Sequence, residues 1–66
     1  MTHLLIMEMS TTLNGIGIDM THLLTLNVFG ITLEECKAAA ATLSYDLPNE
    51  VTPQGLLGGR VFTTCL

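Results

Sequence analysis

Residues 46–58, DLPNEVTPQGLLG, contain both prolines of the chain and end in an apolar pair between two glycines. Pro48 and Pro53 each restrict φ to about −65° and lack a backbone N–H donor. Such residues are tolerated at the edges of sheets and in turns, and they are excluded from central strands. We therefore expect residues 47–54 to form an ordered loop on a surface or at a sheet edge.

The Gly55-Leu56-Leu57-Gly58 element that follows carries a different signal. Its two leucines are best accommodated in an apolar interior, away from water. Its glycines allow backbone conformations and close approaches that a Cβ would obstruct. The element is therefore predicted to be a structural core loop.

The N-terminal part of the chain has the pattern of a β-hairpin. Residues 5, 7 and 9 share one strand face and are apolar, and alternation returns over residues 24–28. Between these segments, Asn14-Gly15 is typical of a two-residue hairpin turn. The pattern predicts strands over 4–13 and 16–28. Near the C-terminus, residues 61–64 (VFTT) also favour a strand.

The spacing of Asp46-Leu47-Pro48 and the Gly55–Gly58 element resembles the C-terminal part of retropepsin-like aspartic proteases. The resemblance covers residues 11–58 and weakens after Gly58, where Arg60 stands in place of the family's Asp. It implies a single small, mainly β domain over 1–66, folded as a retropepsin-like partial barrel. It also implies a flap position at the hairpin tip, which comprises Gly15, Ile16 and Gly17.

Residues 33–43 are open to two interpretations. Thr32 and Glu35 form a capping box, and four alanines follow at 38–41, which together predict a short helix. The retropepsin pattern would instead make 36–46 a strand. A helical insertion followed by a strand at 42–47 would satisfy both the helix signal and the retropepsin pattern.

The resemblance implies an aspartic dyad, but the motif that would supply it is missing. Two carboxylates must lie close enough to share a proton, one acting as acid and the other activating water. Asp46 does not hold a catalytic position in the family. Asp19 is followed by Met20 and Thr21, where the family has Thr or Ser and then Gly. We therefore predict no catalytic residue.

The expectation is that the catalytic loop lay N-terminal to Met1 and is absent through truncation, a mis-set start or degeneration.

Charge and cysteine content narrow the remaining classes of function. The net charge is −4, and Lys37 and Arg60 are the fixed cations, so the chain lacks a basic face for nucleic acid or an anionic membrane. No apolar run approaches the roughly 20 residues of a spanning helix, and residues 4–7 do not form a signal peptide. We expect a cytoplasmic protein in which Cys36 and Cys65 are reduced thiols; a disulfide is the alternative if the chain is secreted.

Metal and cofactor sites are not predicted. His3, His22, Cys36 and Cys65 offer ligand atoms, but no two of them have the short spacing of a structural zinc site. A Cys36–histidine nucleophile pair has no support beyond the residue types.

Two functional hypotheses follow. The chain is a fragment or degenerate member of the retropepsin-like peptidase family without peptidase activity, or it is a non-catalytic small protein that self-associates or binds a partner. It is 48% hydrophobic and 12% charged, more apolar than one small core can bury. We expect a homo-oligomer, with a peptide or protein partner as a further possibility. Residues 4–9 and 61–66 are predicted to form the contacts, as strand edges left unpaired.

Overall fold

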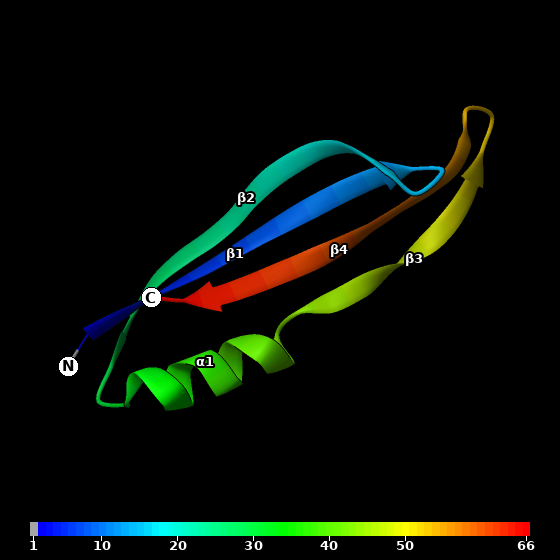
Figure 1. Ribbon diagram of the computed structural model, residues 1–66. Coiled ribbons are helices and arrows are strands. Elements are labelled where there is room, and N and C mark those ends of the chain that lie inside the picture. The colour runs from blue at the N-terminus through cyan, green and yellow to red at the C-terminus, as the bar shows by residue number, and fades with distance from the viewer. Residues whose placement is uncertain (1) are drawn as a thin grey trace.

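The computed structural model describes residues 2–66, which form one four-stranded sheet and one helix (Figure 1). In chain order the elements are β1 (Thr2–Leu13), β2 (Ile16–Phe29), α1 (Leu33–Thr42), β3 (Tyr45–Thr52) and β4 (Gly55–Cys65). The strands lie in the order β2-β1-β4-β3, and every neighbouring pair is antiparallel. The mainly β class with one short helix is confirmed. The sheet is open, with β2 and β3 as its edges; the retropepsin-like arrangement stays a prediction.

The predicted N-terminal hairpin is confirmed. β1 and β2 pair from Thr2 with Phe29 to Leu13 with Ile16. Both turn residues have positive φ, 52° at Asn14 and 82° at Gly15. This is the backbone of a type I′ turn, whose twist matches that of the flanking strands.

The helix interpretation of residues 33–43 is confirmed, and the alternative strand over 36–46 is wrong. The Thr32 side chain accepts a hydrogen bond from the Glu35 N–H at 3.1 Å, and the Glu35 carboxylate accepts one from the Thr32 N–H at 3.0 Å. The backbone hydrogen bond from Thr32, followed by the side-chain one, lowers the pKa of Glu35 below its usual value. Capping and alanine propensity therefore decide this segment, and β3 begins only at Tyr45.

The prediction of a loop over residues 47–54 is wrong for most of its length. β3 continues to Thr52, and only Pro53 and Gln54 form the turn into β4. Pro48 is accommodated because β3 is an edge strand and its register with β4 shifts between Leu47 and Glu50. At such an irregularity on an edge, the missing N–H of proline leaves no ladder bond broken.

The Gly55–Gly58 element belongs to strand β4 and is not a core loop. Leu56 is 42% exposed and Leu57 is half-buried. The prediction of a buried pair is wrong for Leu56, because consecutive strand residues point to opposite faces of a sheet. The close approach expected at the glycines does occur. A Cβ on Gly58 would meet the Asn49 side-chain amide.

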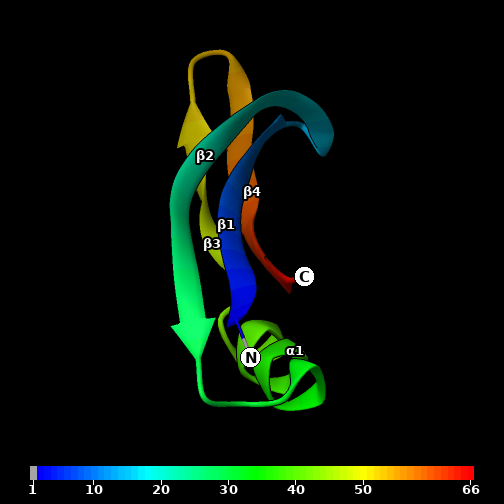
Figure 2. The same ribbon diagram turned by 90° about the vertical axis from the view of Figure 1, so that its left-hand side faces the viewer.

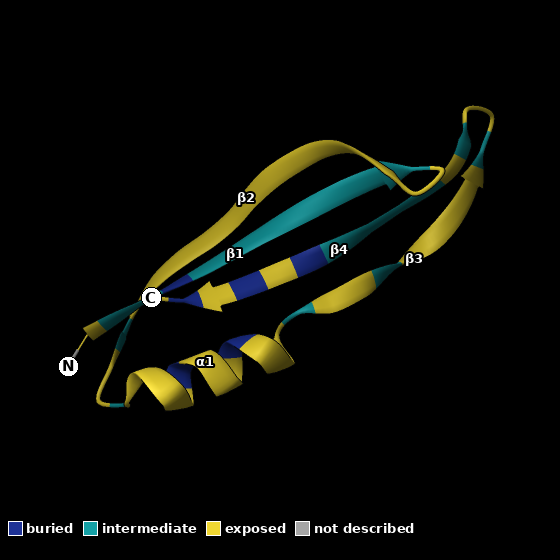
Figure 3. Cartoon of the chain, in the orientation of Figure 1, coloured by how far each residue is buried: buried dark blue, intermediate teal, exposed yellow. Residues whose placement is uncertain are grey.

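The buried core lies at one end of the sheet, where α1 packs mainly on β4 and β1 (Figure 3). Its apolar members are Leu5, Cys36, Ala40, Val61 and Cys65. Thr63 is also buried there, and its hydroxyl donates a hydrogen bond to the Leu43 carbonyl at 3.0 Å. The helix therefore buries side chains only at the end of the sheet on which it packs.

A disulfide joins Cys36 on α1 to Cys65 on β4, with their Cα atoms 5.9 Å apart. The prediction of two reduced thiols is therefore wrong. The two side chains are separated by 29 positions in sequence and are brought together when α1 crosses the end of β4. The bond ties the helix to the sheet inside the core.

The molecule is elongated, with principal dimensions of 48 × 17 × 13 Å. Figure 2 shows α1 at one end and the tips of both hairpins at the other. The long strands therefore run well beyond the part of the sheet that the helix covers.

Candidate functional site

The two aspartates do not form a dyad. Asp19 lies on β2 and Asp46 on β3, the opposite edges of the sheet. They are separated by three strand spacings, roughly 14 Å, so they cannot share a proton. Asp46 is instead paired with Arg60, with 2.7 Å between Oδ1 and a guanidinium nitrogen. The Asp19 carboxylate accepts a hydrogen bond from the neighbouring Met20 N–H at 2.9 Å.

His3 lies on β1 and His22 on β2, and each contacts a residue other than the bonded cysteines. His3 Nε2 is 3.1 Å from the Ile31 carbonyl oxygen, and His22 Nε2 is 2.6 Å from the Thr25 hydroxyl. Within residues 2–66, no three His, Cys, Asp or Glu side chains are grouped so as to hold a metal ion. The disulfide leaves Cys36 without a free thiol, so a nucleophilic Cys36 is ruled out in this structure.

The residues predicted for the flap lie at the tip of the β1–β2 hairpin. Gly15, Ile16 and Gly17 are exposed there. The adjacent Asn14 fixes this tip to β4, because its side-chain oxygen accepts a hydrogen bond from the Leu56 N–H at 2.9 Å. A flap role for this tip stays a prediction.

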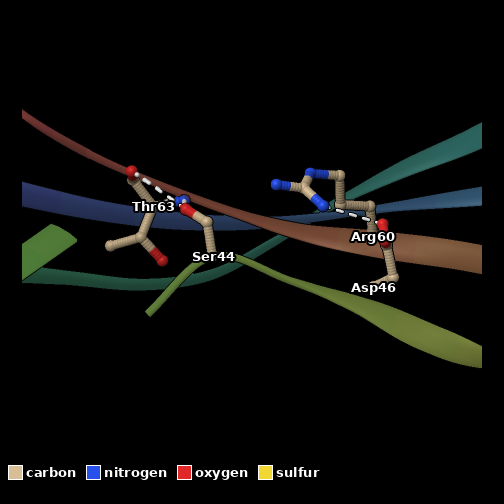
Figure 4. Close-up of polar contacts among 4 residues, drawn as sticks. All are labelled: Ser44, Asp46, Arg60 and Thr63. Carbon is tan, nitrogen blue, oxygen red and sulfur yellow. Dashed lines mark hydrogen bonds and ion pairs between the residues drawn. The ribbon is translucent and has the colours of Figure 1, made fainter. Parts of the chain in front are cut away.

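A depression of about 460 Å³ lies between α1 and the end of β4, and both Lys37 and Arg60 line it. The hydroxyl groups of Ser44 and Thr63 in this lining are already hydrogen-bonded. The Thr63 N–H donates to Ser44 Oγ at 2.9 Å (Figure 4), and Ser44 Oγ donates to the Ala40 carbonyl at 3.3 Å. Arg60 is held by Asp46 in the same view. These contacts fasten the start of β3 and the end of α1 to β4, which is a structural role.

Strand β2 pairs with β1 on its inner side, but its outer edge pairs with no strand within residues 2–66. Thirteen of its fourteen residues are exposed, and the strand stands out along the edge of the sheet in Figure 3. Seven exposed residues are large and apolar: Ile16, Ile18, Met20, Leu23, Leu24, Leu26 and Phe29. They occupy both faces of the sheet, because Met20 lies opposite Ser10 and Leu26 opposite Leu5. This gathering of exposed apolar side chains on one strand makes β2 the candidate interaction site.

The two edges of the sheet differ in how they resist pairing with another strand. β3 has Asp46, Glu50 and Pro48, together with a register shift, which are devices that block strand addition. β2 has two register irregularities but no proline, and Asp19 is its one charged residue. This exposed strand edge was not predicted from the sequence. The available signal was the scarcity of charge over residues 16–29.

The segments predicted for oligomer contacts are not free strand edges. Residues 4–9 belong to β1 and residues 61–65 to β4, the two central strands, which pair with each other from Leu5 with Cys65 to Leu13 with Leu57. That part of the prediction is wrong, because the chain pairs these strands internally. The free edges are β2 and β3.

Comparisons with protein-family models, with curated proteins and with solved structures gave no match. No helix within residues 2–66 has the length and apolar character needed to cross a membrane.

Proposed function

We propose that this chain is a non-catalytic interaction protein that docks an extended polypeptide along β2. The observation that carries the proposal is the combination of an exposed, apolar strand with an outer edge that neither proline nor repeated charge protects. An added strand would supply hydrogen bonds to the free backbone groups and would place its own side chains beside the apolar side chains of β2. The separation of Asp19 from Asp46 supports the non-catalytic part.

The retropepsin-like origin stays a proposal about lineage, supported by the residues at 46–58. Its direct test is the DNA upstream of Met1, which would encode Asp-Thr-Gly or Asp-Ser-Gly in frame. A cytoplasmic location also stays a prediction. The Cys36–Cys65 disulfide counts against it, because such bonds are rare in reducing compartments.

Selection from a displayed library of random peptides tests the docking surface. The protein is used at nanomolar concentration, so that self-association does not cover β2. We expect the selected peptides to be extended and alternately apolar. Met20→Lys should reduce their binding by at least about ten-fold, because a charge on an edge strand opposes strand addition.

The matched control is Val51→Lys on β3, which makes the same kind of change on an edge residue that is 89% exposed. Peptide binding should be unchanged in this variant. Binding that is lost in Val51→Lys and kept in Met20→Lys would place the docking surface on the other edge and would contradict the proposal.

A further inference from the structure

The direction of the free backbone groups on β2 follows from the pairing of β1. Leu4 and Leu66 exchange two backbone hydrogen bonds, of 3.0 and 2.9 Å, so the even-numbered residues of β1 point their backbone groups toward β4. Odd-numbered residues then point toward β2, because backbone groups alternate sides along a strand. Leu5 lies opposite Leu26, which therefore points inward to β1. The backbone groups of Thr25 and Asn27 face outward.

The irregularity at Leu23 reverses this alternation in the other half of β2. Leu24 pairs with Met7, whereas His22 pairs with Glu8, so Leu23 is an extra residue. Beyond it, Thr21 lies opposite Met9 and points inward. The outward-facing residues in this half are therefore Met20 and His22.

The outward-facing residues of one half of β2 match those of the other half in an antiparallel pairing of two copies. When His22 is placed opposite Thr25 of another β2, Met20 falls opposite Asn27. The outward-facing backbone N–H and C=O groups of the two strands then meet. The two-fold symmetry axis then lies between Leu23 and Leu24. The irregularity at Leu23 in one copy therefore faces the same irregularity in the other copy. Side chains of paired residues also lie on one face, since Met20, His22, Thr25 and Asn27 all oppose even-numbered residues of β1.

The charge on β2 is compatible with this register. Asp19 falls opposite Val28 of the other strand, so the two Asp19 side chains lie about nine positions apart, roughly 30 Å. That separation exceeds the Debye length of about 8 Å at physiological salt, and repulsion between them is screened. The single charge that could oppose self-pairing is thus kept away from its own copy.

Resting on the proposed function, we infer that the polypeptide docked along β2 is β2 of a second copy of this chain. The two copies pair antiparallel about a two-fold axis at Leu23–Leu24 and form one continuous sheet. A two-fold contact is self-complementary, as the register requires. Pairing satisfies the backbone groups of the exposed edge and places cross-strand neighbours beside the apolar side chains of β2 on both faces.

Sedimentation velocity over about a hundred-fold range of concentration tests for the second copy. A cross-linking experiment tests the register. Asn27→Cys chains and Met20→Cys chains are mixed and oxidised mildly, with mass spectrometry to check that Cys36–Cys65 is intact. The paired Cα atoms would lie about 5.5 Å apart, within the range that a disulfide spans. The mixture should give at least about ten-fold more cross-linked dimer than either variant alone.

Asp46→Cys mixed with Val51→Cys is the matched control on β3 and should give no such enrichment. A monomer at every concentration would overturn the second copy, while the peptide selection would still report on docking along β2. A dimer without preferential cross-linking of the mixture would overturn the register and hence the proposed pairing.

Discussion

β4 and β2 are the two neighbours of β1, and they meet very different surroundings. The C-terminal half of β4 lies under α1, with Val61, Thr63 and Cys65 buried and a disulfide to the helix. β2 pairs with β1 over its whole length and yet is exposed at all but one residue. The difference teaches that the helix and the disulfide bury only the strand on one side of β1, which is β4. The strand on the other side, β2, has the apolar composition of a core strand, but no helix packs on it.

The size of the chain explains this imbalance. A domain of about 60 residues buries only about 60% of the surface of its unfolded chain, and one short helix cannot cover both flanks of a long sheet. The α1 residues that enter the core are Cys36 and Ala40, both small, which brings the helix close to β4 and limits the area it shields. The uncovered flank is where an external strand would contribute most.

The largest expected effect on stability comes from removing the disulfide between α1 and β4. Cys36→Ser combined with Cys65→Ser should lower the free energy of unfolding by about 3–4 kcal/mol, because the closed loop restricts the unfolded chain. A domain of this size has roughly 3–5 kcal/mol of stability, so the variant should be mostly unfolded by circular dichroism.

A substitution on the uncovered side serves as the control for the disulfide variant. Ile18→Thr on β2 should change the unfolding free energy of the monomer by less than about 0.5 kcal/mol. Chemical denaturation at low protein concentration measures both. Equal losses in the two variants would show that β2 is as much a part of the core as β4.

The next effect concerns association through β2. Asn27→Pro removes an outward N–H without removing a hydrogen bond to β1, and proline is tolerated at such edge positions. The dimer should weaken by at least about 100-fold, equivalent to about 2.7 kcal/mol. Val51→Pro is the matched change at an outward position of β3. Sedimentation equilibrium should show an unchanged dimer for Val51→Pro, and weakening in that variant would contradict the asymmetry of the edges.

Local signals in the sequence predicted most of the secondary structure. Asn14-Gly15 identified the hairpin, and Thr32 with Glu35 identified the start of α1. Both depend on contacts within a few residues, which a sequence displays directly. Pro48 misled the prediction because its effect depends on being in an edge strand, which is a property of the whole sheet.

The disulfide and the β2 surface depend on long-range arrangement. Cys36 and Cys65 meet because α1 crosses the end of β4, and nothing near either cysteine in sequence indicates that crossing. β2 has the apolar alternation of a buried strand, so its pattern predicted a strand but not that it would form an edge. Strand order decides which apolar strand is covered, and hydrophobic pattern alone does not specify strand order.

A smaller effect is expected at the cap of α1. Thr32→Ala removes the hydroxyl that accepts from the Glu35 N–H and should cost about 1 kcal/mol of stability by thermal or chemical denaturation. Hydrogen bonds from Thr32 lower the pKa of Glu35, so the ionised Glu35 carboxylate stabilises the folded chain at pH values above its usual pKa of 4.5. This stabilisation is lost as pH falls from that value through the lowered pKa. Glu35→Gln should remove this acid dependence. An unchanged acid dependence in that variant would assign it to another carboxylate.

The smallest effect is expected at the ion pair of β3. Asp46→Asn removes the partner of Arg60, but the Asp46 side chain is 80% exposed. Exposed pairs contribute little, so stability should change by less than about 0.5 kcal/mol at low salt. A loss above about 1 kcal/mol in denaturant titrations would mean that this pair fixes the β3 edge more strongly than its exposure indicates.

Hydrogen exchange at the outer edge of β2 tests the central claim most directly, because it reports on individual backbone N–H groups in the unmodified chain. Exchange is followed by NMR for the amides of Thr25 and Asn27, with the outward amide of Val51 as the internal control. Pairing with a second copy predicts that the two β2 amides exchange at least about ten-fold more slowly at high protein concentration than after dilution, while Val51 is unaffected. Equally fast exchange of Thr25 and Asn27 at both concentrations would contradict it.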